Sequence, residues 1–568
     1  PQVPDKPGKT AVEMFQAAAD GEIRALWISC TNPAQSMPDQ RTVRRALEKC
    51  ELVIVQEAFS TTATCDYADL LLPATTWGEK VGTVTNSERR ISRVRPAVPA
   101  PGEARHDWSA ATDFARRLET MLPARSATAT LFPYALDSEA GAVAVWNEHR
   151  ESTRGRDLDI TGLSWSMLDS DGPQQWPLPQ GQAQGRQRLY EDGVFPTPDG
   201  RARFFAAPYQ PTAEQREARY PFSLNTGRLR DQWHGMSRTG TLGRLFGHVP
   251  EPVVQLHPQD MARRNLKDGD LVYLTSRRGS IVLPVQASSE QGYSQAFVAM
   301  HWGGEYLSGQ SSGGEPLAGI NALTTPAFCP DSKQPELKHA AVKVLKAELP
   351  WSLLACAWLP ADGALRTLQA LRTLMKEFPF ASCVPFGNAG ALATEHGHEK
   401  SGVLFRAAGH DPAPDELLRQ VEMLLGLSGT DTLRYADARH GQRRAARLVR
   451  AGADAHLEAF LLAGDTRAEA WIKALLLQRL PAQALGRQLL RPGATAPINV
   501  AASGKVVCSC FGVNETAIDL ALKSGSGSEA ERLAALQGAL KCGTNCGSCL
   551  PELKRKVRDA ASREPVGA

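Results

Sequence analysis

The sequence predicts a multidomain chain of α/β and β domains that ends in a small cysteine-rich module. Three observations support this fold class. The first 125 residues alternate between amphipathic helices and short apolar strands, residues 220–346 hold short strands separated by turns, and five of the eleven cysteines lie beyond residue 507. The length of 568 residues also exceeds what one hydrophobic core usually holds, since a domain takes about 100 to 200 residues.

Composition and charge exclude two broad classes of protein. The chain has 64 Lys and Arg against 61 Asp and Glu, a net charge of +3 that is too small for a nucleic-acid binder. Charges or prolines interrupt every apolar run before the roughly 20 residues that a membrane helix needs. We expect a cytoplasmic protein without nucleic-acid or membrane partners, and reduced thiols at the six irregularly spaced cysteines, Cys30, Cys50, Cys65, Cys329, Cys356 and Cys383.

Residues 1–125 predict a doubly wound α/β domain. Apolar strands are expected at 23–29, 52–55 and 70–72, with helices at 11–19 and 41–50 before the first two. In such sheets, ligands bind beyond the carboxyl ends of the strands. We therefore expect a binding crevice at the residues that follow two of the strands, Cys30-Thr31-Asn32-Pro33 and Gln56-Glu57.

The middle of the chain changes character twice. Residues 126–219 are irregular and rich in Pro, Gly and Gln, so we expect a covering segment. Residues 220–346 predict a β-barrel, in which strands at 272–275 and 281–283 form a hairpin. The hairpin's tip carries Arg277 and Arg278, which we expect to be solvated.

Residues 347–492 predict a small mixed α/β domain. Leu/Ala/Arg-rich helices are expected at 414–427 and 467–478, and a strand pair at 432–435 and 457–462. A linker rich in Gly, Ala and Pro follows at 493–504. It separates this domain from a tail domain at 505–562.

The tail carries four cysteines in two close pairs. Cys508-Ser-Cys510 and Cys546-Gly-Ser-Cys549 are 35 residues apart and offer four soft thiolate ligands for a metal ion or a cluster. A structural zinc site is the alternative, although zinc pairs usually follow C-x2-C on both arms. Asn514 should cap a helix at 515–523, and helix starts near the thiolates would stabilise a negative cluster.

Residues 505–560 closely resemble the bacterioferritin-associated ferredoxin-like [2Fe-2S] domain. The similarity lies in the runs Val-Cys-Ser-Cys-Phe-Gly-Val and Lys-Cys-Gly-Thr-Asn-Cys-Gly-Ser-Cys-Leu-Pro. It implies a small helical domain and assigns the ligand roles to Cys508, Cys510, Cys546 and Cys549. Cys542 is a bystander by the same comparison.

Three stretches of the large domains carry polar groups suited to an anionic ligand. They are Trp77 to Arg90, Leu224 to Thr239, and Gly319 to Thr324 with Gln334 to Lys338 behind it. Arg, His, hydroxyl and Gly residues in the second stretch suit a pyrophosphate. Each stretch alone also fits an ordinary salt-bridged loop, and His234 alone fits a packed core histidine.

Together and in this order, the three stretches resemble the molybdopterin oxidoreductase family over residues 10–345. The resemblance implies a double-psi β-barrel at 220–346 and a molybdenum ion held by bis-molybdopterin guanine dinucleotide. It implies cofactor-binding roles for the residues that match the family's motifs. These are Thr226, Gly227, Arg228, Trp233, His234, Asn321 and Lys338, with nucleotide contacts at Asn32 and Glu57.

The combination of this body with the cysteine tail is similar to assimilatory nitrate reductases. That resemblance implies reduction of nitrate to nitrite, electrons that enter through the [2Fe-2S] domain, and a donor such as a ferredoxin or an NADH-dependent flavoprotein subunit. It also places a [4Fe-4S] cluster and the molybdenum ligand upstream of this sequence, so this part alone should not turn over. The alternatives are a formate dehydrogenase of the same family and a non-catalytic electron-transfer or zinc-binding scaffold.

Overall fold

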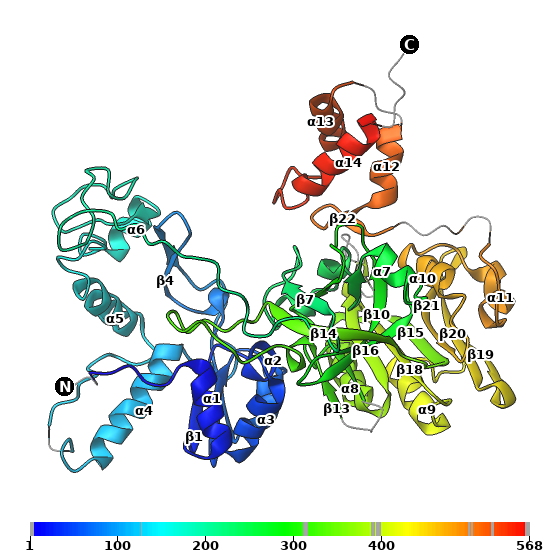
Figure 1. Cartoon of the computed structure of the whole chain (residues 1–568), viewed down its shortest axis with the longest axis horizontal. Coiled ribbons are helices and arrows are strands. Elements are labelled where there is room, and N and C mark those ends of the chain that lie inside the picture. The colour runs from blue at the N-terminus through cyan, green and yellow to red at the C-terminus, as the bar shows by residue number, and fades with distance from the viewer. Residues whose placement is uncertain are drawn as a thin grey trace.

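The computed structural model describes residues 5–126, 128–310, 316–387, 392–393, 399–497, 500, 504–523 and 527–562. Figure 1 shows an N-terminal α/β domain, a helical lobe beside it, a β-barrel continued by a large sheet with helices, and a small helical domain above the barrel. Within the described residues, no helix has the length and apolarity needed to span a membrane.

The N-terminal domain is built on a parallel sheet of order β1-β2-β3. Leu26 and Ile28 of β1 are buried in one core with helices α1 and α3. Trp27, whose side chain alternates to the opposite face, meets Phe114 of α4 edge-on at 5.0 Å between ring centroids. Both faces of the sheet are therefore covered by helices. The elements are α1 (Ala11–Asp20), β1 (Ala25–Ser29), α2 (Pro33–Ser36), α3 (Gln40–Lys49), β2 (Leu52–Glu57), β3 (Leu70–Pro73) and α4 (Asp107–Met121).

Residues 126–219 do not form the covering segment that we expected. They contribute two helices to a lobe with its own core, in which Trp146, Leu163 and Leu178 pack with Ile91. The lobe adds a strand to the hairpin of the first domain and stands at its side in Figure 1. The elements are β4 (Gly82–Thr85), β5 (Arg90–Val94), α5 (Glu139–Glu151), α6 (Trp165–Ser170) and β6 (Gln174–Gln175).

Six strands close into a barrel of order β10-β8-β11-β7-β14-β9. The predicted hairpin is confirmed, since β9 and β10 pair antiparallel. Arg277 forms an ion pair with Glu217 at the surface, as expected. Arg278 is not solvated, because its guanidinium donates two hydrogen bonds to the carboxylate of the buried Glu214. Glu214 lies in the segment of chain that returns from the lobe and packs against the barrel. The double-psi connectivity stays a prediction. The strands are β7 (Phe222–Gly227), β8 (Val254–Leu256), β9 (Leu271–Thr275), β10 (Ser280–Ala287), β11 (Gln295–Ala299) and β14 (His339–Lys346), with α7 (Pro258–Ala262) beside them.

A nine-stranded sheet follows, of order β13-β12-β16-β18-β15-β21-β20-β19, with β17 paired to β18. β12 and β13 come from within 220–346, so the sheet starts earlier in the chain than the expected 347. The expected strand pair is also wrong, because β20 lies between β19 and β21. The strands are β12 (Leu307–Gln310), β13 (Pro316–Ala318), β15 (Trp351–Pro360), β16 (Phe380–Phe386), β17 (Leu392–Ala393), β18 (Glu399–Gly409), β19 (Thr432–Asp437), β20 (Gln442–Ala451) and β21 (Asp454–Ala463).

The central strand β15 joins two cores. Leu353, Ala355 and Ala357 pack with α8 and α9 on one face, and the alternate residues Leu354 and Cys356 pack in the core shared with the barrel and α10. A strand buried on both faces is apolar throughout, which explains the run Leu-Leu-Ala-Cys-Ala-Trp. The helices are α8 (Ala361–Leu374), α9 (Asp415–Leu424), α10 (Glu469–Leu477) and α11 (Gly486–Leu490).

The tail forms a small domain of three helices and a two-stranded sheet. Asn514 caps the first helix as predicted, since its Oδ1 accepts the Ala517 N–H at 2.9 Å. The proposed linker, 493–504, lies partly outside the described residues. The elements are β22 (Val506–Cys508), β23 (Val513–Asn514), α12 (Glu515–Lys523), α13 (Glu529–Leu540) and α14 (Leu550–Ser562).

Candidate functional site

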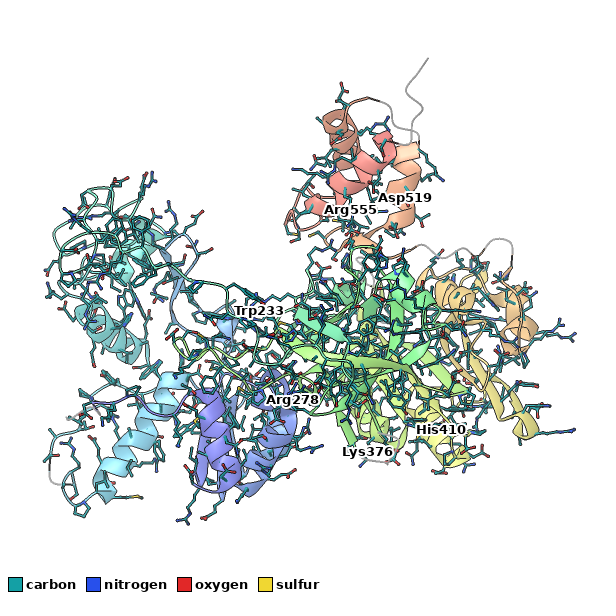
Figure 2. The ribbon with its side chains drawn as sticks, in the orientation of Figure 1. Trp233, Arg278, Lys376, His410, Asp519 and Arg555 are labelled. Carbon is teal, nitrogen blue, oxygen red and sulfur yellow. The ribbon has the colours of Figure 1, made fainter. Side chains whose placement is uncertain are left out.

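A cavity of about 460 Å³ opens between the N-terminal domain and the barrel. Its walls are the residues that follow β1, β2 and β3 on one side and the loop 233–238 after β7 on the other. Trp233 lies at this junction of the two domains in Figure 2. The described residues that line the cavity include none from 126–219. The predicted residues that line it are Asn32, Glu57, Trp233 and His234.

The strand ends form the crevice that the α/β pattern predicts. Cys30 follows β1 with a left-handed φ of 59°, which turns the chain sharply at the cavity wall. The Asp107 carboxylate at the start of α4 accepts a hydrogen bond from Gln56 Nε2 at 2.9 Å and pairs with Lys80 Nζ at 3.3 Å. Polar groups from three separate segments therefore converge at one edge of the sheet.

Asn32 and Glu57 lie in the cavity wall, but much of their hydrogen-bonding capacity is used within the protein. Asn32 Oδ1 accepts from both the N–H and the hydroxyl of Thr64, and its Nδ2 donates to Glu305 at 3.0 Å. Burial raises the pKa of Glu57, although the N–H groups of Ala58 and Phe59 oppose the shift. A second N–H of Asn32 and one carboxyl oxygen of Glu57 remain for a ligand.

Thr226 and Gly227 act mainly as supports for the barrel loop. The Thr226 hydroxyl donates to the carbonyl of Leu337 at 2.8 Å and so joins β7 to the segment that carries Lys338. A Cβ on Gly227 would lie 2.9 Å from the ring of Phe297. This packing favours glycine at the position, and the predicted contact with a phosphate stays a prediction.

Arg228, Trp233 and His234 form the exposed part of the loop. The Arg228 guanidinium lies 5.3 Å from the Trp233 ring centroid, and Trp233 meets His234 edge-on at 4.6 Å. His234 is exposed and has a φ of 44°, and Met236 has a φ of 60°. A loop held in this uncommon conformation by buried neighbours is typical of a binding site. The half-exposed indole offers a flat surface for a heterocyclic ring.

A smaller cavity of about 60 Å³ collects three of the five remaining predicted residues. Thr226, His234, Asn321 and Lys338 line it together, although Asn321 lies far from Thr226 in the sequence. Asn321 Nδ2 donates to the carbonyl of Gln35 at 2.7 Å, so this residue also fastens the barrel to the N-terminal domain. Gly227 and Arg228 line neither cavity.

His301 organises the loop, although the sequence analysis did not single it out. It is fully buried, its Nε2 accepts the Leu229 N–H at 2.9 Å, and its Nδ1 lies 2.6 Å from the His234 carbonyl. Since a carbonyl can only accept, Nδ1 carries the proton and the ring is the neutral tautomer. Burial lowers the pKa of His301 and favours this neutral form. One side chain thus holds both ends of the loop.

Glu305 is the second residue that sequence reasoning missed. Its Oε1 accepts from Asn32 Nδ2 and from the Ala63 N–H, which ties the barrel side of the cleft to two loops of the N-terminal domain. The run His-Trp-Gly-Gly-Glu after β11 contains both missed residues. Its density of polar and glycine residues after an apolar strand was the available signal.

The four tail cysteines gather as two pairs in the structure. Cys510 and Cys546 are exposed and their Sγ atoms lie 3.3 Å apart. The thiols of Cys508 and Cys549 are buried and contact each other. Burial, with a smaller contribution from the neighbouring Cys508, raises the pKa of Cys549 to about 12. Among the described residues, no group of three or more His, Cys, Asp or Glu side chains is arranged to hold a single metal ion.

Two thiol pairs fit a [2Fe-2S] cluster, because each of its two irons takes two thiolates. A zinc ion would need all four around one centre. Cys542 is fully buried and its thiol points to the Leu536 carbonyl at 3.8 Å. Its place in the core of the tail explains a cysteine there without a ligand role.

Three family models match separate parts of the chain. Residues 2–117 match the molybdopterin oxidoreductase family, residues 222–341 the molydopterin dinucleotide binding domain, and residues 506–557 the BFD-like [2Fe-2S] binding domain. The cleft lies between the first two regions, and the paired thiols lie in the third.

Curated relatives are similar to the chain over different lengths. A nitrate reductase of Klebsiella oxytoca is 34% identical over 96% of this chain and 57% of its own length. The assimilatory nitrate reductase catalytic subunit of Bacillus subtilis is 32% identical over 60% of this chain and 44% of its own length. A formate dehydrogenase alpha subunit of Methanocaldococcus jannaschii is 32% identical over 59% and 45%. The chain thus spans about half the length of the curated relatives that it matches.

Among solved structures, acetylene hydratase from Pelobacter acetylenicus aligns with a TM-score of 0.45 at 18% identity, over 59% of this chain and 46% of the other. Domain order, the interdomain cleft and the paired tail thiols agree with the three family matches. The chain therefore carries a molybdopterin oxidoreductase region, a molydopterin dinucleotide binding domain and a BFD-like [2Fe-2S] binding domain, and nitrate reductases are among the proteins to which it is similar.

Proposed function

We propose that this chain is the C-terminal part of a cytoplasmic, molybdopterin-dependent nitrate reductase that reduces nitrate to nitrite. The observation that carries the proposal is the combination of the interdomain cleft with the tail thiols in one chain. The Klebsiella nitrate reductase matches 96% of this chain, a span that includes both features. Electrons would enter through the tail [2Fe-2S] domain, from a ferredoxin or an NADH-dependent flavoprotein subunit.

The residues of the cleft would bind and orient bis-molybdopterin guanine dinucleotide. The bound molybdenum cofactor supplies the two-electron oxygen-transfer chemistry. Trp233 offers a face for a fused ring, and Lys80, Arg238 and Lys338 supply cationic groups for phosphates. Asp107 offers carboxylate oxygens that could accept hydrogen bonds from the N–H groups of guanine. The [4Fe-4S] cluster and the double-psi connectivity that the resemblance implies stay part of this proposal.

Formate oxidation is the second candidate. It rests on the formate dehydrogenase relative, whose match covers 59% of the chain. The two candidates differ in substrate and in the direction of electron flow. The protein that contains this chain should be purified and supplied with nitrate and reduced viologen in one assay, and with formate and oxidised viologen in another. Nitrite formation without formate oxidation is expected, and the reverse result would replace nitrate reduction by formate oxidation.

Arg228 lines neither cavity, but its guanidinium lies 5.3 Å from the ring of Trp233, which lines the larger one, so its substitution tests whether a phosphate of the cofactor lies there. A charge-assisted contact with a phosphate contributes about 1.5 to 3 kcal/mol, about ten- to a hundredfold in affinity. In the same protein, Arg228→Ala should lower the molybdenum and guanine nucleotide that copurify, while the iron of the tail stays unchanged. Arg277→Ala, at the exposed hairpin tip, is the matched control. Full cofactor content in Arg228→Ala with a loss in Arg277→Ala would show that the cofactor lies elsewhere on the barrel.

A further inference from the structure

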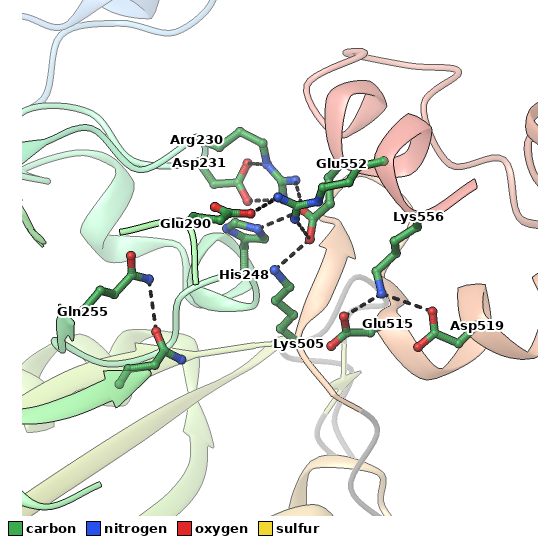
Figure 3. A network of polar contacts seen from close by, with 12 residues as sticks. Arg230, Asp231, His248, Gln255, Glu290, Lys505, Glu515, Asp519, Glu552 and Lys556 are labelled. Carbon is green, nitrogen blue, oxygen red and sulfur yellow. Dashed lines mark hydrogen bonds and ion pairs between the residues drawn. The ribbon is translucent and has the colours of Figure 1, made fainter. Parts of the chain in front are cut away.

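The tail domain contacts the barrel through a cluster of charged groups centred on Glu552. Figure 3 shows Glu552 of α14 between Arg230 and His248 of the barrel and Lys505 of the tail. The Glu552 carboxylate lies 3.4 Å from Arg230 Nη1, 3.1 Å from His248 Nε2 and 2.7 Å from Lys505 Nζ. A further ion pair joins Arg555 to Glu290 at the rim.

The charged groups of this cluster are largely buried. The Glu552 side chain is 12% exposed and that of Arg230 is 17% exposed. Burial acts to raise the pKa of Glu552, but the hydrogen bonds from His248 and Lys505 outweigh it and lower the pKa to about 2. The carboxylate is therefore charged at neutral pH and attracts cations from both domains.

The backbones of the two domains also meet directly. The Val506 N–H donates to the Gly247 carbonyl at 2.9 Å. A Cβ on Gly247 would lie 2.8 Å from both Cβ and Cγ2 of Val506. Gly247 itself has φ −65° and ψ −30°, which any residue adopts, so the tail domain is what excludes a side chain here. This close approach is a steric signature of the docked tail.

The docked face of the tail is the face that carries its thiols. Ser509, between Cys508 and Cys510, donates its hydroxyl to Asp231 at 2.7 Å. Glu552 comes three residues after Cys549, and the charge of Arg230 acts on the Cys549 thiol. Arg230 and Asp231 belong to the same loop as Trp233, which lines the larger cavity.

We propose that Glu552 is a positioning residue of an ionic latch that holds the thiol face of the tail on the Arg230–Asp231 turn. In this docked state the turn would hold the thiols that carry the [2Fe-2S] cluster on the side of the barrel that leads to the cleft, and so would lie on the route of electrons toward the cofactor. The electron route rests on the proposed function. The latch does not, since it depends only on contacts within this chain.

The latch is tested by Gly247→Ala, which blocks docking by steric overlap and leaves every charge in place. In the full chain, hydrogen exchange of the Val506 amide should become about tenfold faster or more, because its acceptor moves away. Val506→Gly removes the overlapping atoms, so the double variant should return toward the slow exchange of the unmodified chain. Unchanged exchange in Gly247→Ala would overturn the latch.

Substitutions of charged residues test the latch independently and allow a matched control. Glu552→Gln should speed exchange at Val506 in the same direction. Lys556→Gln removes the ion pairs of Lys556 with Glu515 and Asp519, which lie wholly inside the tail, and should leave Val506 unchanged. An equal acceleration in both variants would mean that the tail loosens internally, and it would refute Glu552 as the latch.

The electron route needs the whole, cofactor-loaded protein. After nitrate is added, the electron paramagnetic resonance signal of the reduced cluster should decay more slowly in Gly247→Ala than in the unmodified protein. Nitrate reduction with reduced viologen as the donor, which bypasses the tail, should stay unchanged. Equal decay in both proteins would overturn the route and leave the latch standing. Absence of nitrate reduction in the unmodified protein would instead contradict the proposed function, and the exchange results would be unaffected.

Discussion

His301→Phe should loosen the loop 228–238 that follows β7 while leaving the barrel folded. Phenylalanine keeps an aromatic ring in the fully buried position of His301 but offers neither an acceptor nor a donor. The Leu229 N–H and the His234 carbonyl would then both lose the partners that lie 2.9 Å and 2.6 Å away. These two groups stand at opposite ends of the turn that carries Arg230 and Trp233, so the turn would lose its anchor.

The size of the effect follows from the two contacts. Leaving a buried donor or acceptor without a partner costs about 1 to 3 kcal/mol, and 1.4 kcal/mol corresponds to a factor of ten. If the free energy of local opening of the loop falls by the cost of the unpaired Leu229 N–H, the Leu229 amide should exchange about five to a hundred times faster. The adjacent strand β7, held by β11 and β14, should keep its protection.

Hydrogen exchange of the full chain, followed on peptides that cover residues 222–240, measures the protection of both the Leu229 amide and strand β7. The measurement needs no bound cofactor. His301→Gln keeps a side-chain oxygen and amide, and we expect it to fall between the unmodified chain and His301→Phe. His410→Phe changes an exposed histidine of the sheet domain and should leave the loop unaffected. Unchanged exchange at Leu229 in His301→Phe would refute the anchoring role.

Three further predictions concern the thiols, the domain junction and pH. Cys508→Ser should abolish the visible absorbance of the tail cluster, whereas Cys542→Ser should keep it; equal loss in both would mean that a ligand is misassigned. Glu251→Gln should lower the melting temperature, by the equivalent of about 3 to 5 kcal/mol, because Lys473 loses the carboxylate that lies 2.9 Å away, while Arg406 keeps Glu469 at 2.8 Å; an unchanged melting temperature would contradict this. Burial lowers the pKa of His301 below 6.5, so the stabilisation from its neutral form is present above pH 6.5 and is lost as pH falls through the lowered pKa. Leu229 exchange, corrected for the intrinsic pH effect, should rise between pH 7 and 5 in the unmodified chain and stay flat in His301→Gln.

Local patterns in the sequence were enough to find the parts of the site that are continuous in the chain. The ends of β1 and β2 are recognisable because apolar strands give way to polar residues, and the cavity indeed lies there. The tail pairs are recognisable because two soft ligands at short spacing have few other uses in a reduced protein. The hairpin of β9 and β10 and the Asn514 cap are likewise set by neighbours in sequence.

Other expectations failed where the deciding contact is distant in sequence. Arg278 looked like a solvated tip, but the chain brings Glu214 to it after a detour through the helical lobe. β19 and β21 looked like a pair, but β20, with its many arginines, inserts between them and buries Arg444. A charged residue is expected to be exposed unless a residue distant in the sequence provides a partner for its charge.

The sequence by itself determined the order of the domains, the strand ends of the cleft and the thiol set of the tail, because short-range spacing encodes each of them. Only the tertiary structure decided which side chains close the cleft and where the tail docks. His301, Glu305 and the Gly247–Val506 contact act through partners tens to hundreds of residues away. Such contacts form when separate cores pack together, and no local pattern of residue types specifies that packing.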